Sequence, residues 1–331
     1  MSTVILKEGS QRQSNIDLLK GGLILFVIIG HVLQGTLYDN VCRYIIYSFH
    51  MPLFIGISGY LFNYSKCGFA SLKEIILKYL FRVIVPWVVA VLVYIPLVNL
   101  VNLPSEDLLK LTFDSFIKPY YHLWFIPGFL SWILVTWIAG KVRVSVEKLL
   151  VLSCVISIAS LVLKEYPALY FKIPVLGKVI DLVLYTFRPF FYVFFVFGIY
   201  LRSKPLLSYL RLDVGMALVG AIGTLLLFYY PSKIASIPLF FLFNLVLLRV
   251  SIKISRKGLL PRSGWIEWVG VNSLGFYLWH VVPIIVVRLF VGTEDLTRFY
   301  VVLCICELIF AGALVQMTRI KLINKYLFGM G

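Results

Sequence analysis

Charged side chains are scarce in this chain, and acidic ones are the scarcest. Only 14% of the 331 residues are Asp, Glu, Lys or Arg, against roughly a quarter in soluble globular domains. Acidic residues number 15, basic residues 31, and 61% of the chain is hydrophobic. So little charge cannot cover a water-exposed surface, which excludes an ordinary soluble domain and indicates an integral membrane protein.

Cysteine is also sparse, and its spacing excludes two kinds of site. The five cysteines are an odd number and show no paired ligand spacing, so neither a disulfide framework nor a zinc site is expected. We also find no repeat of fixed period, no low-complexity tract and no long polar linker. We therefore expect one membrane domain over residues 1–331, with no metal and no appended soluble domain.

Long apolar runs recur along the chain and predict an all-α, polytopic fold. Each is long enough for a helix that crosses a bilayer, and the first lacks the cleavage pattern of a signal peptide. The runs predict about ten transmembrane helices, at 19–36, 44–63, 83–101, 122–140, 147–163, 180–201, 213–230, 234–250, 267–289 and 299–318.

Basic residues alternate between the predicted loops. If the N-terminus is cytoplasmic, the inner segments hold more than twice as many Lys and Arg as the outer loops, as the positive-inside rule requires. Both termini are then cytoplasmic. The net charge of +16 is scattered over short inner loops, so we expect contact with the lipid bilayer and no nucleic acid.

All four histidines lie in or beside apolar segments: His31, His50, His122 and His280. The predicted topology places every one of them in the outer half of the membrane. Ionisable groups inside membrane helices are costly and mark functional sites, and imidazole exchanges protons near neutral pH. We therefore expect proton chemistry rather than simple membrane crossing.

Two polar stripes run along predicted helices. Lys20 and His31 are eleven positions apart. Over eleven residues an α-helix returns to within about 20° of the same face and rises about 16 Å, so both side chains lie on one face. Ser273, Tyr277 and His280 follow helical spacing, with Asn272 beside them. For Ser273 and Asn272, an interhelical hydrogen-bond seam is an equally good interpretation.

Further ionisable and aromatic residues are candidates. Lys78 and Arg82 are four apart and can grip an anion together, although positive-inside flanking explains them as well. Arg188 and Glu307 lie in apolar runs, and each needs a partner or a polar cavity. Trp124 can stack on a sugar, but an interfacial aromatic belt is the favoured alternative.

Four motifs together resemble acyltransferase family 3, a family of membrane proteins. NIDLLKGGLILFVIIGH, which ends at His31, has ten residues between a basic residue and a histidine. FHMPLFIGISGYLF begins at Phe49, HLWFIPG at His122 and NSLGFYLWH at Asn272. In the first of these motifs, Lys20 matches the family's basic position and His31 its essential histidine. The resemblance departs at Lys78 and Arg82, since family members often carry two arginines three apart.

The resemblance implies an O-acyltransferase of a bacterial inner membrane. Such an enzyme moves an acyl group, usually acetyl from cytoplasmic acetyl-CoA, to a hydroxyl of O-antigen, capsule or exopolysaccharide sugars or a lipid-linked sugar. The short surface-sugar O-acetyltransferases look nearest.

We assign expected roles on this basis. Alcohol attack on a thioester needs a base, for which we expect His31, with His280 or Tyr277 stabilising the oxyanion. CoA phosphates would contact basic residues, and other residues would support the acceptor side. The expected donor-binding residues are Lys20, Lys78 and Arg82; the expected supporting residues are His50, His122, Trp124, Asn272, Ser273 and Arg188.

Two other functions fit parts of the pattern. A transporter or flippase for a lipid-linked sugar would also need interior ionisable groups, although the sequence shows neither inverted repeats nor broken-helix signals in matching halves. An acyl carrier that supplies a partner enzyme would share the first half-reaction.

Overall fold

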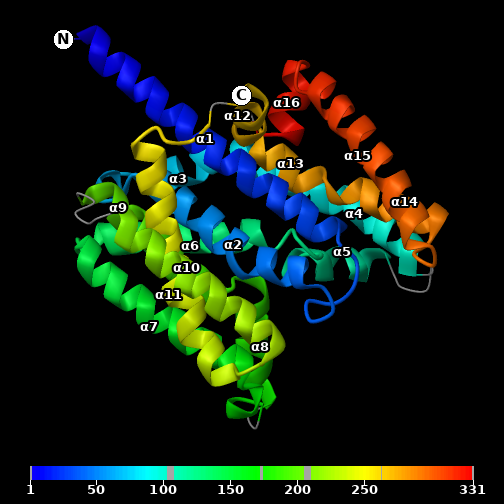
Figure 1. The fold of residues 1–331 in the computed structure, drawn as a ribbon, viewed down its shortest axis with the longest axis horizontal. Helices are drawn as coiled ribbons and strands as arrows, with labels where there is room; N and C mark the ends of the chain where they lie inside the picture. The colour runs from blue at the N-terminus through cyan, green and yellow to red at the C-terminus, as the bar shows by residue number, and fades with distance from the viewer. Residues whose placement is uncertain (1, 103–107, 172–173, 205–209, 262, 330–331) are drawn as a thin grey trace. The chain divides into compact units, whose positions relative to one another are not determined.

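The computed structural model describes residues 2–102, 108–171, 174–204, 210–261 and 263–329. Within these residues every regular element is a helix (Figure 1). The predicted all-α fold is therefore confirmed.

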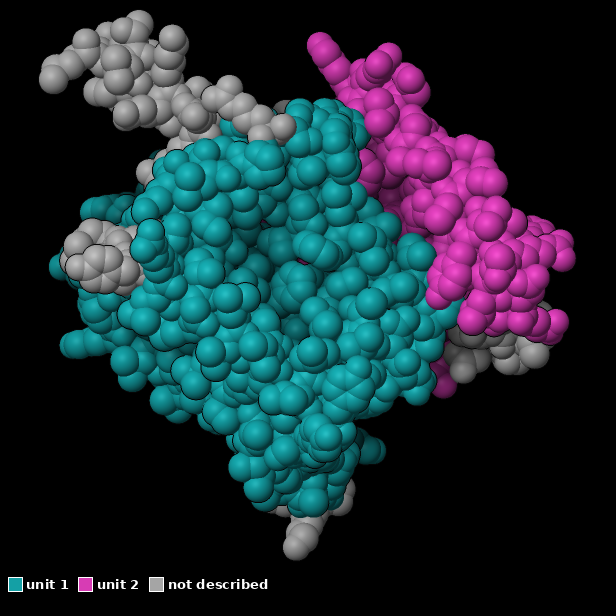
Figure 2. Space-filling view, viewed as in Figure 1, with its two compact units in different colours: residues 1–70, 128–271 teal, residues 71–127, 272–331 magenta. Residues whose placement is uncertain are grey.

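The chain divides into two compact units, each built from two separate stretches (Figure 2). Unit 1 comprises Met1–Ala70 and Gly128–Val271, and unit 2 comprises Ser71–Pro127 and Asn272–Gly331. The residues predicted to be functional fall in both units. A single domain over residues 1–331 stays a prediction.

Unit 1 holds most of the long helices. Its elements are α1 (Ser2–Val32), α2 (Val41–Leu61), η1 (Tyr64–Lys66), the greater part of α6 (Phe125–Lys141), α7 (Val146–Glu165), η3 (Pro167–Leu169), α8 (Pro174–Thr186), η4 (Pro189–Phe191), α9 (Tyr192–Ser203), α10 (Leu210–Tyr229), α11 (Lys233–Arg256) and α12 (Gly264–Val271).

Unit 2 contains shorter helices on either side of one long one in each stretch. Its elements are α3 (Leu72–Tyr79), the π-helix η2 (Leu80–Ile84), α4 (Val85–Asn102), α5 (Leu108–Ile117), the first residues of α6, α13 (Ser273–Trp279), α14 (Val281–Val291), α15 (Leu296–Met317) and α16 (Lys321–Leu327).

Polar caps explain where several helices begin. A side-chain oxygen just before the first turn accepts a backbone N–H that has no partner inside the helix. This occurs at Asn40, Ser71, Ser145, Ser232 and Asp295. At Ser71 the cap is reciprocal, because Glu74 also accepts the Ser71 N–H at 2.7 Å. Short polar residues between apolar runs thus set the helix starts.

Eight helical segments of the described residues are long and apolar enough to cross a membrane. They are Ser14–Val32, Val41–Leu61, Leu72–Asn99, Val146–Glu165, Leu210–Tyr229, Lys233–Arg256, Ser273–Val291 and Leu296–Met317. A ninth span is formed if the bent pair Val175–Thr186 and Pro189–Ser203 counts as one, and α6 is a shorter apolar helix. The chain is thus a multi-pass membrane protein, while the number ten and the cytoplasmic termini stay predictions.

One predicted helix, 180–201, is broken. α8 and the segment that begins at Pro189 meet at 46°. Arg188 adopts φ +43°, a left-handed conformation. Pro189 has no N–H to continue the helix and restricts the residue before it. The prediction of one continuous helix over 180–201 is therefore wrong.

A second predicted helix, 267–289, is interrupted at Asn272. The backbone there leaves the helical region, with φ −92° and ψ 17°, so α12 ends at Val271 and α13 begins at Ser273. The Asn272 side chain forms no cap hydrogen bond there. The stripe from Ser273 to Tyr277 remains on one helix.

Glycines allow two helices of unit 1 to touch through their backbones. A Cβ atom on Gly198 of α9 would overlap the carbonyl oxygen of Gly56 on α2, and one on Gly59 would overlap that of Phe195. Close approach of this kind is typical of small residues between membrane helices. Gly59 and Gly198 thus allow the close approach of α2 and α9.

Polar contacts connect α2, α10 and α11 of unit 1. Pro52 cannot donate to the carbonyl of Ser48, four residues earlier, and the Asn244 side-chain N–H donates to that oxygen instead, at 2.9 Å. This joins α2 to α11. In addition, the buried carboxylate of Asp213 on α10 pairs with Lys253 and lies 3.5 Å from Arg249 Nε on α11.

The glycine contact can be tested by adding one methyl group. We expect Gly198→Ala to lower the free energy of unfolding by about 1–3 kcal/mol, the usual cost of overpacking. Thermal unfolding in detergent micelles would measure the change. Gly215→Ala is the matched control, since a Cβ on Gly215 meets nothing within 4 Å; equal melting temperatures for both variants would contradict the prediction.

Candidate functional site

His31 lies in the last turn of α1 and is half-buried. Its Nδ1 is 3.0 Å from the hydroxyl oxygen of Tyr47 on α2. The two rings meet edge to face with centroids 5.7 Å apart. Unit 1 therefore gives the predicted base a hydrogen-bonding neighbour on the next helix.

Tyr47 is held by residues on the same face of α2. The guanidinium of Arg43 is 5.3 Å from the centre of its ring, and the centre of the His50 ring is 5.0 Å from it. Residues spaced by three and four positions share a helix face. Arg43, Tyr47, His50 and His31 thus form one cluster, here called the unit 1 imidazole cluster.

The loop before α2 is tied to this cluster. Arg43 donates to the carbonyl of Gly35, whose φ of +93° favours glycine. Thr36 donates through its hydroxyl and amide to Asp39 at 2.7 and 3.1 Å, which lowers the pKa of that carboxyl. The loop that follows His31 is therefore held by its own hydrogen bonds.

His50 differs from His31 because it is buried and bound to a main-chain carbonyl. Its Nδ1 is 2.6 Å from the oxygen of Ile46. A carbonyl can only accept, so Nδ1 carries the proton and Nε2 of the neutral ring carries the lone pair. The structure brings His50 to His31 through Tyr47, as the supporting role requires.

Lys20 lies eleven residues before His31 on the same uninterrupted helix, α1. Its ammonium forms a 2.9 Å ion pair with Asp17, one turn earlier. The prediction that one helix carries both Lys20 and His31 is confirmed.

Unit 2 contains a second group of imidazoles, here called the unit 2 imidazole cluster. His122 precedes α6 and His280 separates α13 from α14, yet their ring centroids are 5.2 Å apart. Tyr277 and Tyr94 meet the His122 ring at 5.5 and 5.2 Å. Both imidazoles are almost fully buried.

Carbonyl acceptors also determine which ring nitrogens of this cluster carry a proton. His280 Nδ1 is 2.9 Å from the oxygen of Phe276, and His122 Nε2 is 3.3 Å from that of Leu278. Both of these nitrogens must therefore carry a proton. The hydroxyl of Tyr277 donates to the carbonyl of His122, so its proton is engaged in this arrangement.

Three expected supporting residues of unit 2 lie close to this cluster in the sequence: Trp124, Asn272 and Ser273. Trp124 is buried and meets Phe125 edge to face at 6.2 Å, while Phe125 lies 5.3 Å from Tyr277. Asn272 and Ser273 are buried at the start of α13. Their interpretation as a hydrogen-bond seam remains open.

Lys78 and Arg82 are exposed on consecutive elements of unit 2. Lys78 lies in the last turn of α3, and Arg82 lies in the π-helix η2. Four residues overshoot one α-helical turn by about 40°, and the wider π turn reduces that overshoot. Single π turns are frequent at functional sites, which favours a shared binding role.

Arg188 and Glu307, the two ionisable residues in apolar runs, belong to different units. Arg188 is in unit 1, where Nε donates to the Tyr185 carbonyl at 3.4 Å. Glu307 is in unit 2, on α15. A polar cavity at either residue stays a prediction.

Sequence reasoning missed three residues of these clusters: Arg43, Tyr47 and Tyr94. The spacing of Arg43, Tyr47 and His50 was a usable signal, because it places all three on one helix face. Tyr94 had no such signal, since its hydroxyl donates at 2.9 Å to Leu278, which is distant in sequence. Among the described residues, no group of three or more His, Cys, Asp or Glu could hold a metal ion.

Comparison with known proteins agrees with the motifs. A family profile described as an acyltransferase domain, Acyl_transf_3, matches residues 13–316. No solved structure matches.

Two curated proteins resemble a short part of the chain. They are the nodulation proteins NolL of Sinorhizobium fredii (strain NBRC 101917 / NGR234), at 44% identity, and of Mesorhizobium japonicum (strain LMG 29417 / CECT 9101 / MAFF 303099), at 46%. Each similarity covers 59 residues, 16% of this chain and 16% of the relative. The family profile, by contrast, spans nearly the whole chain and all four histidine motifs, and on that basis the chain belongs to acyltransferase family 3.

Proposed function

We propose that this acyltransferase moves an acetyl group from acetyl-CoA to a hydroxyl of a surface glycan, such as an O-antigen, capsule or exopolysaccharide sugar or a lipid-linked sugar. The observation that carries the proposal is the half-buried His31, hydrogen-bonded to Tyr47 within an acyltransferase domain. The bacterial inner membrane is the proposed location, because the donor is cytoplasmic and the acceptor is destined for the surface.

His31 is the proposed general base. Its partly accessible ring can take the proton of the acceptor hydroxyl while the oxygen attacks the thioester carbon. A carbon–oxygen bond forms, the carbon–sulfur bond breaks, and the thiolate leaves. The buried imidazoles, His50 among them, are less accessible to a sugar hydroxyl.

His280 and Tyr277 are the proposed stabilisers of the oxyanion. Both groups already donate a hydrogen bond to a main-chain carbonyl, which limits how they can donate to an oxyanion. The Nδ1 proton of His280 already points to a carbonyl, so this ring donates to an oxyanion only when Nε2 is also protonated. Tyr277 must first release the His122 carbonyl. Donors that are aligned in advance contribute most to such stabilisation.

Lys20, Lys78 and Arg82 are the proposed contacts to the CoA phosphates. Charge-assisted hydrogen bonds to phosphate are stronger than neutral ones, and Lys78 and Arg82 are exposed to an incoming donor. The proposed acceptor-side or supporting residues are His50, His122, Trp124, Asn272, Ser273 and Arg188.

One observation favours the alternative of a transporter or flippase for a lipid-linked sugar. The pair α8 and α9 is bent at Arg188, and discontinuous helices often form the substrate sites of transporters. The first experiment therefore measures transfer and export together.

We expect His31→Ala to lower acetyl transfer about 10²- to 10⁴-fold, because the acceptor hydroxyl then has no base. The measurement is ester-linked acetyl on surface glycans of cells that carry the intact gene, a deletion, or the deletion complemented with either the natural gene or the variant. Membrane abundance must be equal in the complemented strains.

Cys42→Ser serves as the matched control, since Cys42 is exposed on α2. Full acetylation with His31→Ala would refute the base assignment. Unchanged acetylation in every strain, with altered glycan export in the deletion, would instead support the transporter.

For the donor contacts we expect Arg82→Gln to raise the KM for acetyl-CoA about tenfold with little change in kcat. A lost charge-assisted hydrogen bond is worth about 1.4 kcal/mol or more. Steady-state kinetics of purified protein in lipid nanodiscs would show this. Lys73→Gln on α3 is the control, and an equal KM increase in both variants would indicate a general charge effect and contradict the assignment.

A further inference from the structure

We propose that Tyr47 is the positioning residue of the reaction: its hydroxyl oxygen accepts the Nδ1 proton of His31 and thereby directs the Nε2 lone pair at the acceptor hydroxyl. This inference rests on the proposed function of His31. It assigns a role to a residue outside the four histidine positions.

The hydrogen bond between Tyr47 and His31 bears on which nitrogen of His31 can act as the base. A general base must present an unprotonated nitrogen, and a neutral imidazole has only one. The 3.0 Å contact joins Tyr47 to Nδ1, so a proton held there leaves the lone pair on Nε2. The same contact persists when Nε2 becomes protonated.

The surroundings of Tyr47 bear on the position of its hydroxyl. Its ring contacts both the Arg43 guanidinium at 5.3 Å and the His50 ring at 5.0 Å. Arg43 is in turn bound to the Gly35 carbonyl in the loop after α1. A ring with two such neighbours keeps its hydroxyl in place, and misplacement of about 1 Å can cost a hundredfold in rate.

The proton balance follows from this geometry. The acceptor hydroxyl gives its proton to His31 Nε2 as the new carbon–oxygen bond forms and the carbon–sulfur bond breaks. His31 then gives that proton to the leaving CoA thiolate. The Nδ1 proton stays between His31 and Tyr47 throughout, so the ring needs no rotation between the two transfers.

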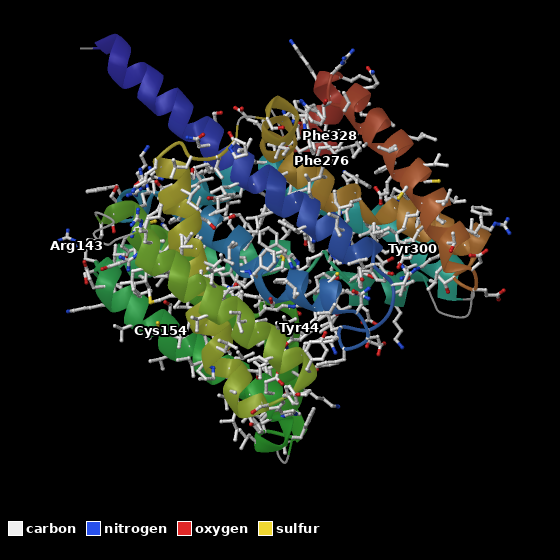
Figure 3. All side chains as sticks on the ribbon, viewed as in Figure 1. Tyr44, Arg143, Cys154, Phe276, Tyr300 and Phe328 are labelled. Carbon is white, nitrogen blue, oxygen red and sulfur yellow. The ribbon has the colours of Figure 1, made fainter. Side chains whose placement is uncertain are left out.

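The test removes only the hydroxyl. We expect Tyr47→Phe to lower kcat about 10- to 100-fold, while the KM for acetyl-CoA stays within twofold, because orientation of the base acts on the transition state. Tyr44→Phe is the matched control, because it loses a tyrosine hydroxyl one turn earlier on α2. Tyr44 is labelled in Figure 3, and its ring packs against that of Phe228. Kinetics are measured in nanodiscs. Both variants must have the melting temperature of the natural protein, which shows that they are folded.

Three outcomes would overturn the proposal: kcat of Tyr47→Phe within twofold of the natural protein, an equal loss in Tyr44→Phe, or a loss confined to KM. A double-mutant comparison adds a further criterion. In the His31→Ala background, Tyr47→Phe should cause no additional loss, because positioning acts only through His31. A purely structural role would lower the residual rate again.

The same series separates this inference from the proposed function. Full transfer activity in His31→Ala would refute the assignment of His31 as the base. Loss of transfer in His31→Ala, together with normal kcat in Tyr47→Phe, would leave the function standing and reject only the role of Tyr47.

Discussion

Hydrogen bonding to main-chain carbonyls is the constraint on which both imidazole clusters depend. Among packed apolar helices, a buried N–H or O–H that lacks an acceptor is costly, and side-chain acceptors are rare in a chain with so few acidic residues. Carbonyl oxygens take their place for His50, His122, His280 and Tyr94. The bonds of His50 and His280 lie within one helical turn, while those of His122 and Tyr94 to Leu278 connect segments that are distant in sequence.

This constraint also separates the histidines by chemistry. A carbonyl fixes one tautomer of the imidazole that it binds, and burial restricts the access of substrate to the other nitrogen. His31 is less buried, and its partner Tyr47 is a hydroxyl that can accept or donate. The four histidine motifs thus contain imidazoles in two kinds of environment, and this difference is the reason for proposing His31 as the base.

Apolar runs predicted the all-α fold well because a membrane helix must satisfy its backbone hydrogen bonds internally, a requirement that composition alone reveals. The spacing of Lys20 and His31 was likewise sufficient to place both on α1. Helix interruptions at Arg188 and Asn272 were missed, since a single residue changes the backbone there while the apolar pattern continues. Contacts such as Tyr47 with His31 depend on how two helices align, and hydrophobic periodicity does not specify that alignment.

The glycine contact between α2 and α9 has a consequence for the conformational entropy of assembly. Gly56, Gly59 and Gly198 have no side chains whose rotamers must be frozen when the helices meet. In a bilayer the helices form before they associate, so the backbone entropy of these glycines is already lost by that stage. The helix that carries Tyr47 and His50 can therefore dock on α9 with little additional ordering.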